Sequence, residues 1–359
     1  MKLLASILTA WASVQVGMTM TVAFQPQPQP IRKRSSSSSS SSSQLHLKTY
    51  DASAVSGCKQ VTVIGGTGFV GSKVCELLVA QGVDVTSVSK SGSYKSSVND
   101  SSDDESWTSK VTWNAADLLT ADESTIDAAI GSPNAIISCL GVIGNDSTIL
   151  KQGNGDANCA AFASAAKSSK LSRAIYVSVS SEVVACQDSW LPEFFKGYFD
   201  GKAMAEACAL DAVDGDSTKV CLVKPSFIYG GDKFGLLPPR VTSEYGSFIE
   251  ELLSLGVFNF LADITPGLIK VALRAPSSVE AVAGACVDAA LGDSDSSAGK
   301  TLEGCVEINE ASGQPPATGL TDAVEWVKEK TGEVVEFTKE EVIPKVLAKV
   351  EEIQKASKK

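Results

Sequence analysis

The stretch Lys59-Gln60-Val61-Thr62-Val63-Ile64-Gly65-Gly66-Thr67-Gly68-Phe69-Val70-Gly71 decides the fold. Val61, Val63 and Ile64 make the end of the first six residues mostly apolar, which predicts a short buried strand. Glycines follow at once, and a helical pattern then continues to about Ala80, where Gln81-Gly82 closes it. A strand, a glycine-rich turn and a helix in this order predict the first unit of a parallel α/β sheet.

The glycines of this turn satisfy two phosphate-binding spacings, Gly66-x-Gly68-x-x-Gly71 and Gly65-x-x-Gly68-x-x-Gly71. Glycine allows a tight turn, close approach of the backbone to a pyrophosphate, and close packing of helix on strand. The start of the helix then presents free N–H groups and its positive dipole end to the phosphates. We predict a dinucleotide-binding loop formed by Gly65, Gly66, Thr67, Gly68, Phe69, Val70 and Gly71; the alternative is a glycine-rich turn that binds no ligand.

Strand and helix patterns alternate through the next 150 residues. Strands are expected at 83–88, 110–113, 135–140, 174–178 and 219–223, and helices at 126–130, 155–168 and 197–212. Residues 91–108 are rich in Ser and Asp and are interpreted as an exposed loop. The pattern predicts a doubly wound Rossmann sheet of parallel strands with a small C-terminal substrate lobe.

The end of the second predicted strand bears on cofactor choice. An NAD site usually has an acid there, but the chain has Ser87-Val88-Ser89-Lys90-Ser91, and Asp84 lies too early. Ser89 and Lys90 could instead hold a 2′-phosphate, which favours NADP over NAD, although Lys90 could also be an ordinary solvated lysine. Three residues after later strands are further candidates: Asp117 and Leu118 for the adenine, and Gly141 for the ribose.

Tyr198 and Lys202 form a Tyr-x-x-x-Lys pair. On a helix these positions share a face, and an ammonium near a phenol lowers the pKa of the phenol. The phenol could then exchange a proton with a substrate oxygen while Lys202 binds the ribose. Ser180 is the preferred residue to polarise that oxygen, with Ser178 and Ser181 as competitors and Asn158 as a weaker relay. The alternative is that Tyr198 packs on the sheet and Lys202 is solvated.

The composition excludes several functions. The net charge is −11, and residues 1–50 contain five basic and no acidic residues, so the remainder has 26 basic against 42 acidic residues. Such a surface disfavours nucleic acid and docking on anionic lipid by charge alone. The only histidine, His46, lies in residues 1–48, which are interpreted below as a targeting presequence. The mature protein would then have no histidine, which excludes histidine triads and zinc sites with histidine ligands. The nine cysteines include no Cys-x-x-Cys, so we expect buried free thiols in a reducing compartment and no metal.

Residues 1–48 are interpreted as a bipartite targeting presequence. The apolar run from Leu3 to about Phe24 follows Lys2 and is typical of a signal peptide, with a membrane anchor as the alternative. A basic, serine-rich segment without acids follows, which is the composition of a transit peptide. The junction Ala23-Phe24-Gln25-Pro26 resembles the presequences of algae with complex plastids, which predicts a plastid, with the mitochondrion as the alternative.

Several motifs together resemble the extended and atypical short-chain dehydrogenase/reductase superfamily. They are the glycine loop, Ile137-Ser138-Cys139-Leu140-Gly141, Tyr176-Val177-Ser178, the helix from Gly197 to Glu206, and Lys224-Pro225-Ser226-Phe227-Ile228-Tyr229-Gly230. Within it, the chain is similar over about residues 58–292 to NAD(P)-binding proteins related to the Rossmann accessory subunit of respiratory complex I. That group includes plant plastid proteins of the plastoglobule type and a fungal protein tied to coenzyme Q synthesis. The resemblance implies that Pro225, Ser226 and Phe227 border the nicotinamide, and that some members are structural rather than catalytic.

The rest of the chain is divided as follows. Residues 57–310 form the NAD(P)-binding domain, with a substrate lobe at about 227–275 and a further covering segment at 186–197. The lobe contains an apolar stretch, 248–273, which is interpreted as a pocket for a lipophilic substrate such as a prenylquinone, as a membrane- or plastoglobule-surface helix, or as ordinary core. Ser277-x-x-Glu280 predicts the start of a helix to Leu291, residues 301–309 a last strand, and 311–359 a charged helical extension. Two functions remain: an NADP-dependent oxidoreductase, or a noncatalytic NAD(P)H-binding scaffold of a membrane complex or plastoglobule.

Overall fold

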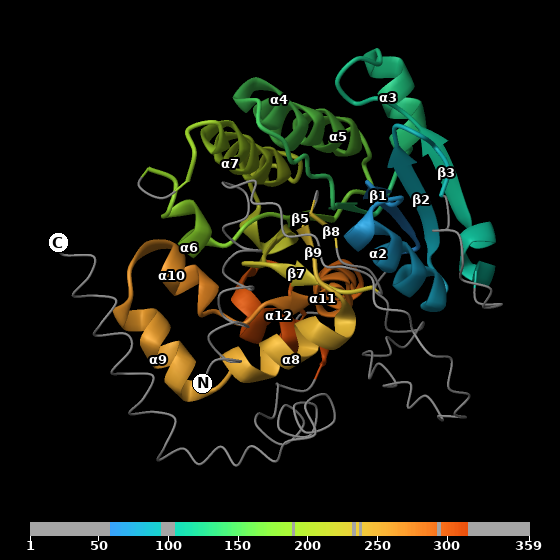
Figure 1. Cartoon of the computed structure of the whole chain (residues 1–359). Helices are drawn as coiled ribbons and strands as arrows, with labels where there is room; N and C mark the ends of the chain where they lie inside the picture. The colour runs from blue at the N-terminus through green and yellow to red at the C-terminus, as the bar shows by residue number, and fades with distance from the viewer. Residues whose placement is uncertain are drawn as a thin grey trace, which may run out of the picture.

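The parallel sheet predicted from the sequence forms the centre of the molecule (Figure 1). The structure is a computed structural model, and it describes residues 58–94, 105–188, 191–231, 235–236, 239–292 and 296–314. The presequence and residues 315–359 of the predicted charged helical extension lie outside the described residues.

Seven parallel strands pair in the order β11-β6-β5-β4-β1-β2-β3. They are β1 (Gln60–Ile64), β2 (Asp84–Ser89), β3 (Val111–Ala115), β4 (Ala135–Ser138), β5 (Arg173–Val177), β6 (Val220–Lys224) and β11 (Thr301–Glu303). The first strand pairs on one side with β2 and on the other with β4, so the chain reverses its direction of winding between β1 and β4. Ligands of open α/β sheets bind in the crevice at this point, beyond the carboxyl ends of the strands. The predicted doubly wound fold is confirmed.

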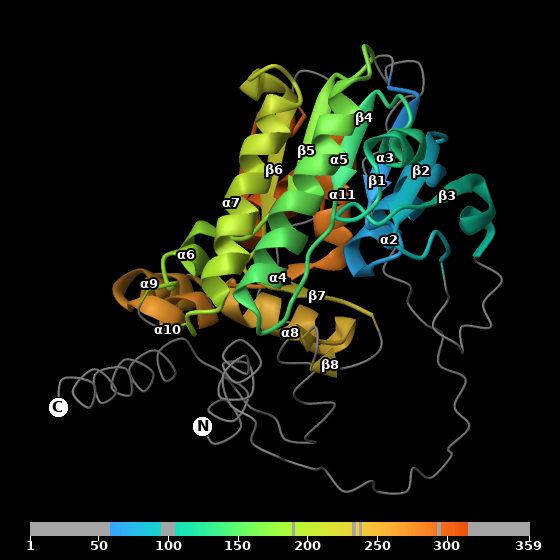
Figure 2. The same ribbon diagram turned by 90° about the horizontal axis from the view of Figure 1, so that it is seen from above.

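Helices cover both faces of the sheet (Figure 2). On one face, α2 (Phe69–Ala80) packs against α11 (Val279–Leu291), and their apolar side chains meet those of β1, β2 and β5 in one core. On the other face, α3 (Glu123–Ile130), α5 (Ala157–Ala166) and α7 (Phe195–Asp211) build a second core around Phe162 and Tyr176. Both faces of the central strands are therefore buried, as parallel strands require.

The helix that carries Tyr198 and Lys202 packs unusually close to its neighbours. Before α5 the chain forms α4 (Ser147–Lys151) and one π-helical turn, η2 (Gln152–Asp156). A Cβ on Gly197 would lie 1.9 Å from the carbonyl oxygen of Ser147, and one on Gly201 would lie 2.9 Å from that of Lys151. Only glycine fits at these two positions of α7, so they fix how the helix rests on α4 and η2.

The lobe lies across one end of the sheet (Figure 2). Its elements are β7 (Ile228–Tyr229), β8 (Gly235–Leu236), β9 (Pro239–Arg240), α8 (Ser243–Leu253), α9 (Gly256–Ile264), α10 (Gly267–Ala272) and β10 (Ser277–Ser278). Most of the apolar residues at 248–273 form a small core of their own, which includes Phe248, Ile249, Leu253, Phe258 and Leu261. Three remain well exposed: Phe260 at 56%, Ile264 at 47% and Ile269 at 39%.

Three local predictions are wrong. Residues 304–312 form a helix, α12 (Gly304–Ser312), because Gly304 adopts φ +71° and turns the chain out of β11 after three residues. Ser277 lies in β10, and Ser278 is the residue that caps α11, with its side chain accepting from the N–H of Ala281. The predicted loop 91–108 ends in a 3₁₀ turn, η1 (Glu105–Lys110), because Trp107 packs against both Tyr94 and Trp113, whose rings also stack on each other.

The expectation that all cysteines are free thiols is also wrong. Cys159 of α5 and Cys208 of α7 form a disulfide, with their Cα atoms 5.2 Å apart, and the other seven cysteines are free. The two residues are 49 positions apart, so no short spacing such as Cys-x-x-Cys announces the bond. It joins the two helices at a point where both side chains are half-buried.

Cys159→Ser should lower the free energy of unfolding by about 2 to 4 kcal/mol, because the cross-link restricts the unfolded chain. Urea denaturation without reductant measures the loss. The single variant Cys208→Ser and the double variant should lose the same amount of unfolding free energy. A thiol assay on denatured, unreduced wild type should detect seven reactive thiols. Nine reactive thiols, or a double variant as stable as the wild type, would contradict the cross-link.

Candidate functional site

The glycine loop joins β1 to α2 at the switch point of the sheet. Gly65 adopts φ +78°, and its N–H donates to the carbonyl oxygen of Val88 at 2.9 Å. A Cβ on Gly71 would lie 2.2 Å from the carbonyl oxygen of Gly65, and one on Gly66 would lie 2.3 Å from the Oγ of Ser87. The loop is thus folded back on the first turn of the helix, a conformation that larger residues at these positions would prevent.

The start of α2 has the properties of an anion site. Gly68 is the N-cap, it is exposed, and it offers no side chain to the free N–H groups of the first turn. That first turn also contains no acidic residue. By contrast, the N-terminus of α3 is capped by Asp122 and that of α8 by Thr242. N–H groups that no cap side chain engages, a positive dipole end and no acidic residue in the first turn fit a pyrophosphate, with Thr67, Phe69 and Val70 half-buried in the loop and the first turn.

At the end of β2 the structure brings two of the predicted residues together. The Nζ of Lys90 lies 3.1 Å from the Oδ2 of Asp117, in the turn after β3, and the Lys90 side chain is 71% exposed. The N–H of Leu119 and the Lys90 ammonium together hold the pKa of the Asp117 carboxyl below its usual range. Ser89 accepts from the N–H of Gly92, and the side chain of Leu118 is buried in the second core.

Tyr198 and Lys202 both lie on the side of α7 that faces the sheet. The Nζ of Lys202 donates to the carbonyl oxygen of Val177, at the end of β5, at 2.9 Å. It lies 4.8 Å from the ring centre of Tyr176 and 5.8 Å from that of Tyr198. Lys202 is buried, so the solvated alternative is excluded, while Tyr198 is half-buried and packs edge-on against Phe195 and Phe199.

Burial dominates the ionisation of this pair. It lowers the pKa of the Lys202 ammonium to about 8, against the opposing effect of Cys139 and Glu206. It raises the pKa of the Tyr198 phenol to about 12, so the phenol is protonated at neutral pH. The sequence argument expected the ammonium to lower the pKa of the phenol, and in this structure the loss of solvent has the larger effect.

The three serines after β5 have different partners. Ser180 is the N-cap of α6 (Ser181–Val184), and its Oγ accepts from the N–H of Glu182 at 3.2 Å. Its hydroxyl proton is not used by this bond and remains available to donate. Ser178 donates to Glu206 at 2.5 Å, and Ser181 donates to Glu303 at 2.5 Å. Of the three, Ser180 is the one whose hydroxyl proton is not used by a hydrogen bond within the described residues.

Asn158 lies beneath the end of β4 and is held by Ser138 and by the carbonyl oxygen of Asn154. Asn154 was not singled out from the sequence. It is fully buried, its amide donates to the carbonyls of Val142 and Leu150, and its Oδ1 accepts from the N–H of Val142. Its position in a π-helical turn next to two glycines is the one signal that could have pointed to it.

The remaining predicted residues follow two strands of the sheet, Gly141 after β4 and Pro225, Ser226 and Phe227 after β6. A Cβ on Gly141 would lie 3.6 Å from Asn154 Oδ1 and 3.7 Å from Lys202 Nζ, so the bare backbone leaves room next to the ammonium. The carbonyl of Pro225 accepts from the N–H of Ser180 at 3.1 Å, and Phe227 packs against the lobe core. The Oγ of Ser226 is buried and has no hydrogen-bond partner among the described residues, which leaves it free for a ligand.

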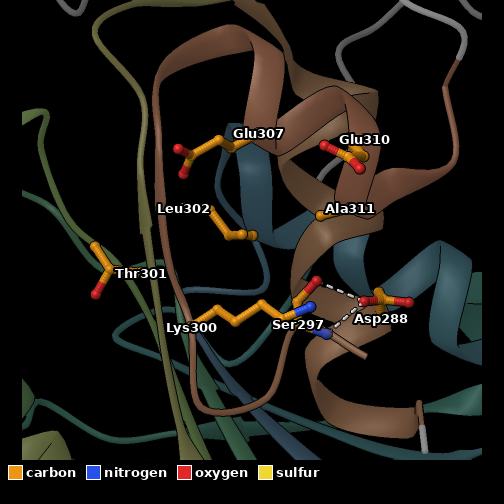
Figure 3. A pocket seen from close by; sticks show the side chains of 8 residues that line it. All are labelled: Asp288, Ser297, Lys300, Thr301, Leu302, Glu307, Glu310 and Ala311. Atoms are coloured by element: carbon orange, nitrogen blue, oxygen red, sulfur yellow. Dashed lines mark hydrogen bonds between the residues drawn. The ribbon is translucent and has the colours of Figure 1, made fainter. Parts of the chain in front are cut away.

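A pocket of about 400 Å³ lies elsewhere, at the outer edge of the sheet between α11, β11 and α12 (Figure 3). Asp288, Lys300, Glu307 and Glu310 line it, and Asp288 accepts from both the N–H and the hydroxyl of Ser297. Three strands separate β11 from β1, so this pocket is not part of the site at the glycine loop.

Across the described ranges, no group of three or more His, Cys, Asp or Glu could hold a metal, and no helix could cross a membrane.

Known proteins resemble this chain in sequence. An uncharacterized chloroplastic protein of Arabidopsis thaliana is 35% identical over 179 residues, which is 49% of this chain and 52% of that protein. MIOREX complex component 2 of Saccharomyces cerevisiae is 31% identical over 84 residues, which is 23% of this chain and 29% of the yeast protein. The chain therefore spans about half the length of the Arabidopsis relative and less than a third of the yeast relative. Together the two relatives are compatible with a location of this chain in a plastid or a mitochondrion.

Among solved structures, a putative epimerase from Burkholderia cenocepacia is 18% identical, with a TM-score of 0.46 over 78% of this chain and 83% of that chain. Vestitone reductase from alfalfa is 18% identical, with a TM-score of 0.45 over 76% of this chain and 82% of that chain. The model of the NAD dependent epimerase/dehydratase family matches residues 61–254, more than half of the chain. This match includes the glycine loop, Tyr198 and Lys202, and on its strength this chain belongs to the NAD dependent epimerase/dehydratase family, of the extended short-chain dehydrogenase type.

Proposed function

We propose that this protein is an NADP-dependent oxidoreductase that acts on a carbonyl or alcohol of a lipophilic, quinone- or isoprenoid-like substrate in a plastid. The observation that carries the proposal is the place of Tyr198 and Lys202. Both lie on α7 at the carboxyl ends of β4 and β5, and the Lys202 ammonium donates to Val177 there. The glycine loop, with its open helix start, occupies the end of the neighbouring strand β1.

The residues divide the work as follows. The first turn of α2 binds the pyrophosphate, Lys202 and the bare backbone at Gly141 hold a ribose, and Ser226 borders the nicotinamide. The nicotinamide, when bound, supplies or accepts the hydride. Because the phenol of Tyr198 is protonated at neutral pH, it can donate a proton to the oxygen of a carbonyl, and Ser180 can donate a hydrogen bond to the same oxygen. Reduction of a carbonyl is the direction that this ionisation state favours.

The charge at the end of β2 supports NADP over NAD. Residues 87–93 contain Lys90 and four serines but no acid that could accept from a ribose 2′-hydroxyl. Lys90 is largely exposed and forms an ion pair with Asp117. It is therefore able to turn toward a 2′-phosphate while Asp117 remains near the adenine.

Two observations support the other parts of the proposal, which are a lipophilic substrate, peripheral contact with a membrane or plastoglobule, and a plastid location. The lobe exposes Phe260, Ile264 and Ile269, which suit an apolar ligand or surface. The name of the Arabidopsis relative calls that protein chloroplastic.

A second candidate is a noncatalytic NAD(P)H-binding scaffold that serves a membrane complex or plastoglobule. It is favoured by the name of the yeast relative, which describes that protein as a component of a complex. The two candidates share cofactor binding and differ in whether the phenol of Tyr198 is needed.

Gly68→Asp should weaken NADPH binding at least tenfold while the unfolding temperature changes little, because the gain from a preferred N-cap offsets the contact of 3.1 Å between the new Cβ and the carbonyl oxygen of Gly65. Aspartate is a preferred N-cap, so it stabilises α2, but its carboxylate would occupy the anion site and repel the phosphates. Calorimetric titration and thermal melts measure the two effects. Ser169→Asp, in an exposed turn before β5, is the control for the added charge. Unchanged NADPH affinity in Gly68→Asp would rule out this helix start as the phosphate site.

Lys90→Ala should weaken NADPH binding about tenfold and leave NADH binding within twofold, because only NADPH has the 2′-phosphate. The measurement is fluorescence titration with each nucleotide. Lys170→Ala, at an exposed turn after α5, is the control. Equal losses for both nucleotides, or none, would contradict the choice of NADP.

Tyr198→Phe should bind NADPH with an affinity within about twofold of wild type but reduce carbonyl turnover by 10²-fold or more, because the proton donor is lost. Absorbance at the nicotinamide band, over a panel of quinones and isoprenoid aldehydes, measures turnover. Complementation of a strain that lacks the gene separates the two candidates. If Tyr198→Phe restores growth fully, the scaffold is the correct function.

A further inference from the structure

A carboxylate on α7 connects the helix to two strands of the sheet. The Oε1 of Glu206 accepts from the hydroxyl of Ser178, just beyond β5, at 2.5 Å. Its Oε2 lies 3.0 Å from the Nζ of Lys224, the last residue of β6. The side chains of Glu206 and Lys224 are only 23% and 14% exposed. The three residues thus form a shielded link from the middle of α7 to the ends of β5 and β6.

Glu206 follows Lys202 by four residues and therefore lies on the same face of α7. Tyr198, Lys202 and Glu206 follow each other at intervals of four residues and so form one line along the helix. The line is held from both sides, because Gly197 and Gly201 fix the helix against α4 and η2. The Glu206 link fixes it against the strands.

The surroundings of Lys202 contain few groups that favour an ammonium. Its hydrogen bond goes to the carbonyl of Val177, and the rings of Tyr176 on β5 and Tyr198 on α7 lie on either side. The titratable groups near it are the thiol of Cys139 after β4, the two phenols and Glu206. Burial keeps the two phenols protonated at neutral pH, and Glu206 is the carboxylate among these groups.

We propose that Glu206 is a positioning residue for the reaction assigned above: held by Ser178 and Lys224, it keeps the Lys202 ammonium charged and aimed at the cofactor ribose. The role in orienting Lys202 toward the ribose rests on the proposed function, whereas the effect of Glu206 on the charge of Lys202 does not. Burial lowers the pKa of Lys202 to about 8, while Cys139 and, after it, Glu206 raise that pKa. Removing the charge of Glu206 lets the ammonium lose its proton at a lower pH.

The test must separate this role from simple packing, since Glu206→Gln leaves Lys224 with no carboxylate in the link. The double variant Glu206→Gln/Lys224→Met removes both charges and keeps side chains of similar size, so it controls for the unpaired lysine. Glu123→Gln, which breaks the exposed pair with Lys167, controls for loss of an ordinary ion pair. Thermal melts show which variants are folded.

The direct readout is the ¹⁵N shift of the Lys202 side chain against pH in the ligand-free protein, assigned by its absence in Lys202→Arg. The wild-type midpoint should lie near pH 8, and both Glu206 variants should titrate about one unit lower, while Glu123→Gln titrates like wild type. The pH dependence of the NADPH dissociation constant should move in the same direction, with affinity lost as pH rises through the new midpoint.

A midpoint in the double variant equal to that of the wild type overturns the proposal, because Glu206 would then act only as the partner of Lys224. So does a displaced midpoint with an unchanged pH profile of NADPH binding. Absence of NADPH binding to the wild type at every pH contradicts the proposed function instead, while the ¹⁵N titration still decides whether Glu206 sustains the charge of Lys202.

Discussion

The contact between Gly71 and the carbonyl oxygen of Gly65 determines how the rest of the site is arranged. A single methyl group at Gly71 would meet that oxygen at 2.2 Å, so α2 can start this close to β1 only with glycine there. The close start directs the free N–H groups of the helix over the end of β1, next to the crevice between β1 and β4. The site therefore exists at this place because backbone meets backbone, before any catalytic side chain is considered.

The same physical device positions the second half of the site. Gly197 and Gly201 bring α7 into backbone contact with α4 and η2, and the disulfide joins α7 to α5 six residues after Lys202. Because Tyr198 and Lys202 follow each of these glycines by one residue, their direction is set by the rotation of the helix. A helix held by bulkier residues could turn, and the ammonium would then miss the carbonyl of Val177.

Much of this fold could be predicted because its signals are local. Strand runs of four to six apolar residues, and glycines at fixed spacing, require no knowledge of distant residues. The errors arise where distant parts of the chain decide. Trp107 turns a polar segment into a packed 3₁₀ turn, Gly304 converts an expected strand into α12, and Cys159 meets Cys208 only after two helices pack. Of the site, Tyr198, Lys202 and the loop carried motifs, whereas Asn154 and Glu206 resemble ordinary helix residues in sequence.

Charge at this site is decided by desolvation more than by pairing. Near pH 8 the charged and neutral forms of the Lys202 side chain have similar free energies, because burial lowers its pKa to about 8. Burial raises the pKa of Tyr198 to about 12, so its phenol stays protonated. An ammonium near its point of neutralisation responds to nearby charge, and the carboxylate of Glu206, four residues away on the same helix, raises its pKa. A surface lysine would not respond in this way, because water would screen the same carboxylate. Burial thus makes the Lys202 charge dependent on Glu206, although both residues occupy ordinary positions on an α-helix.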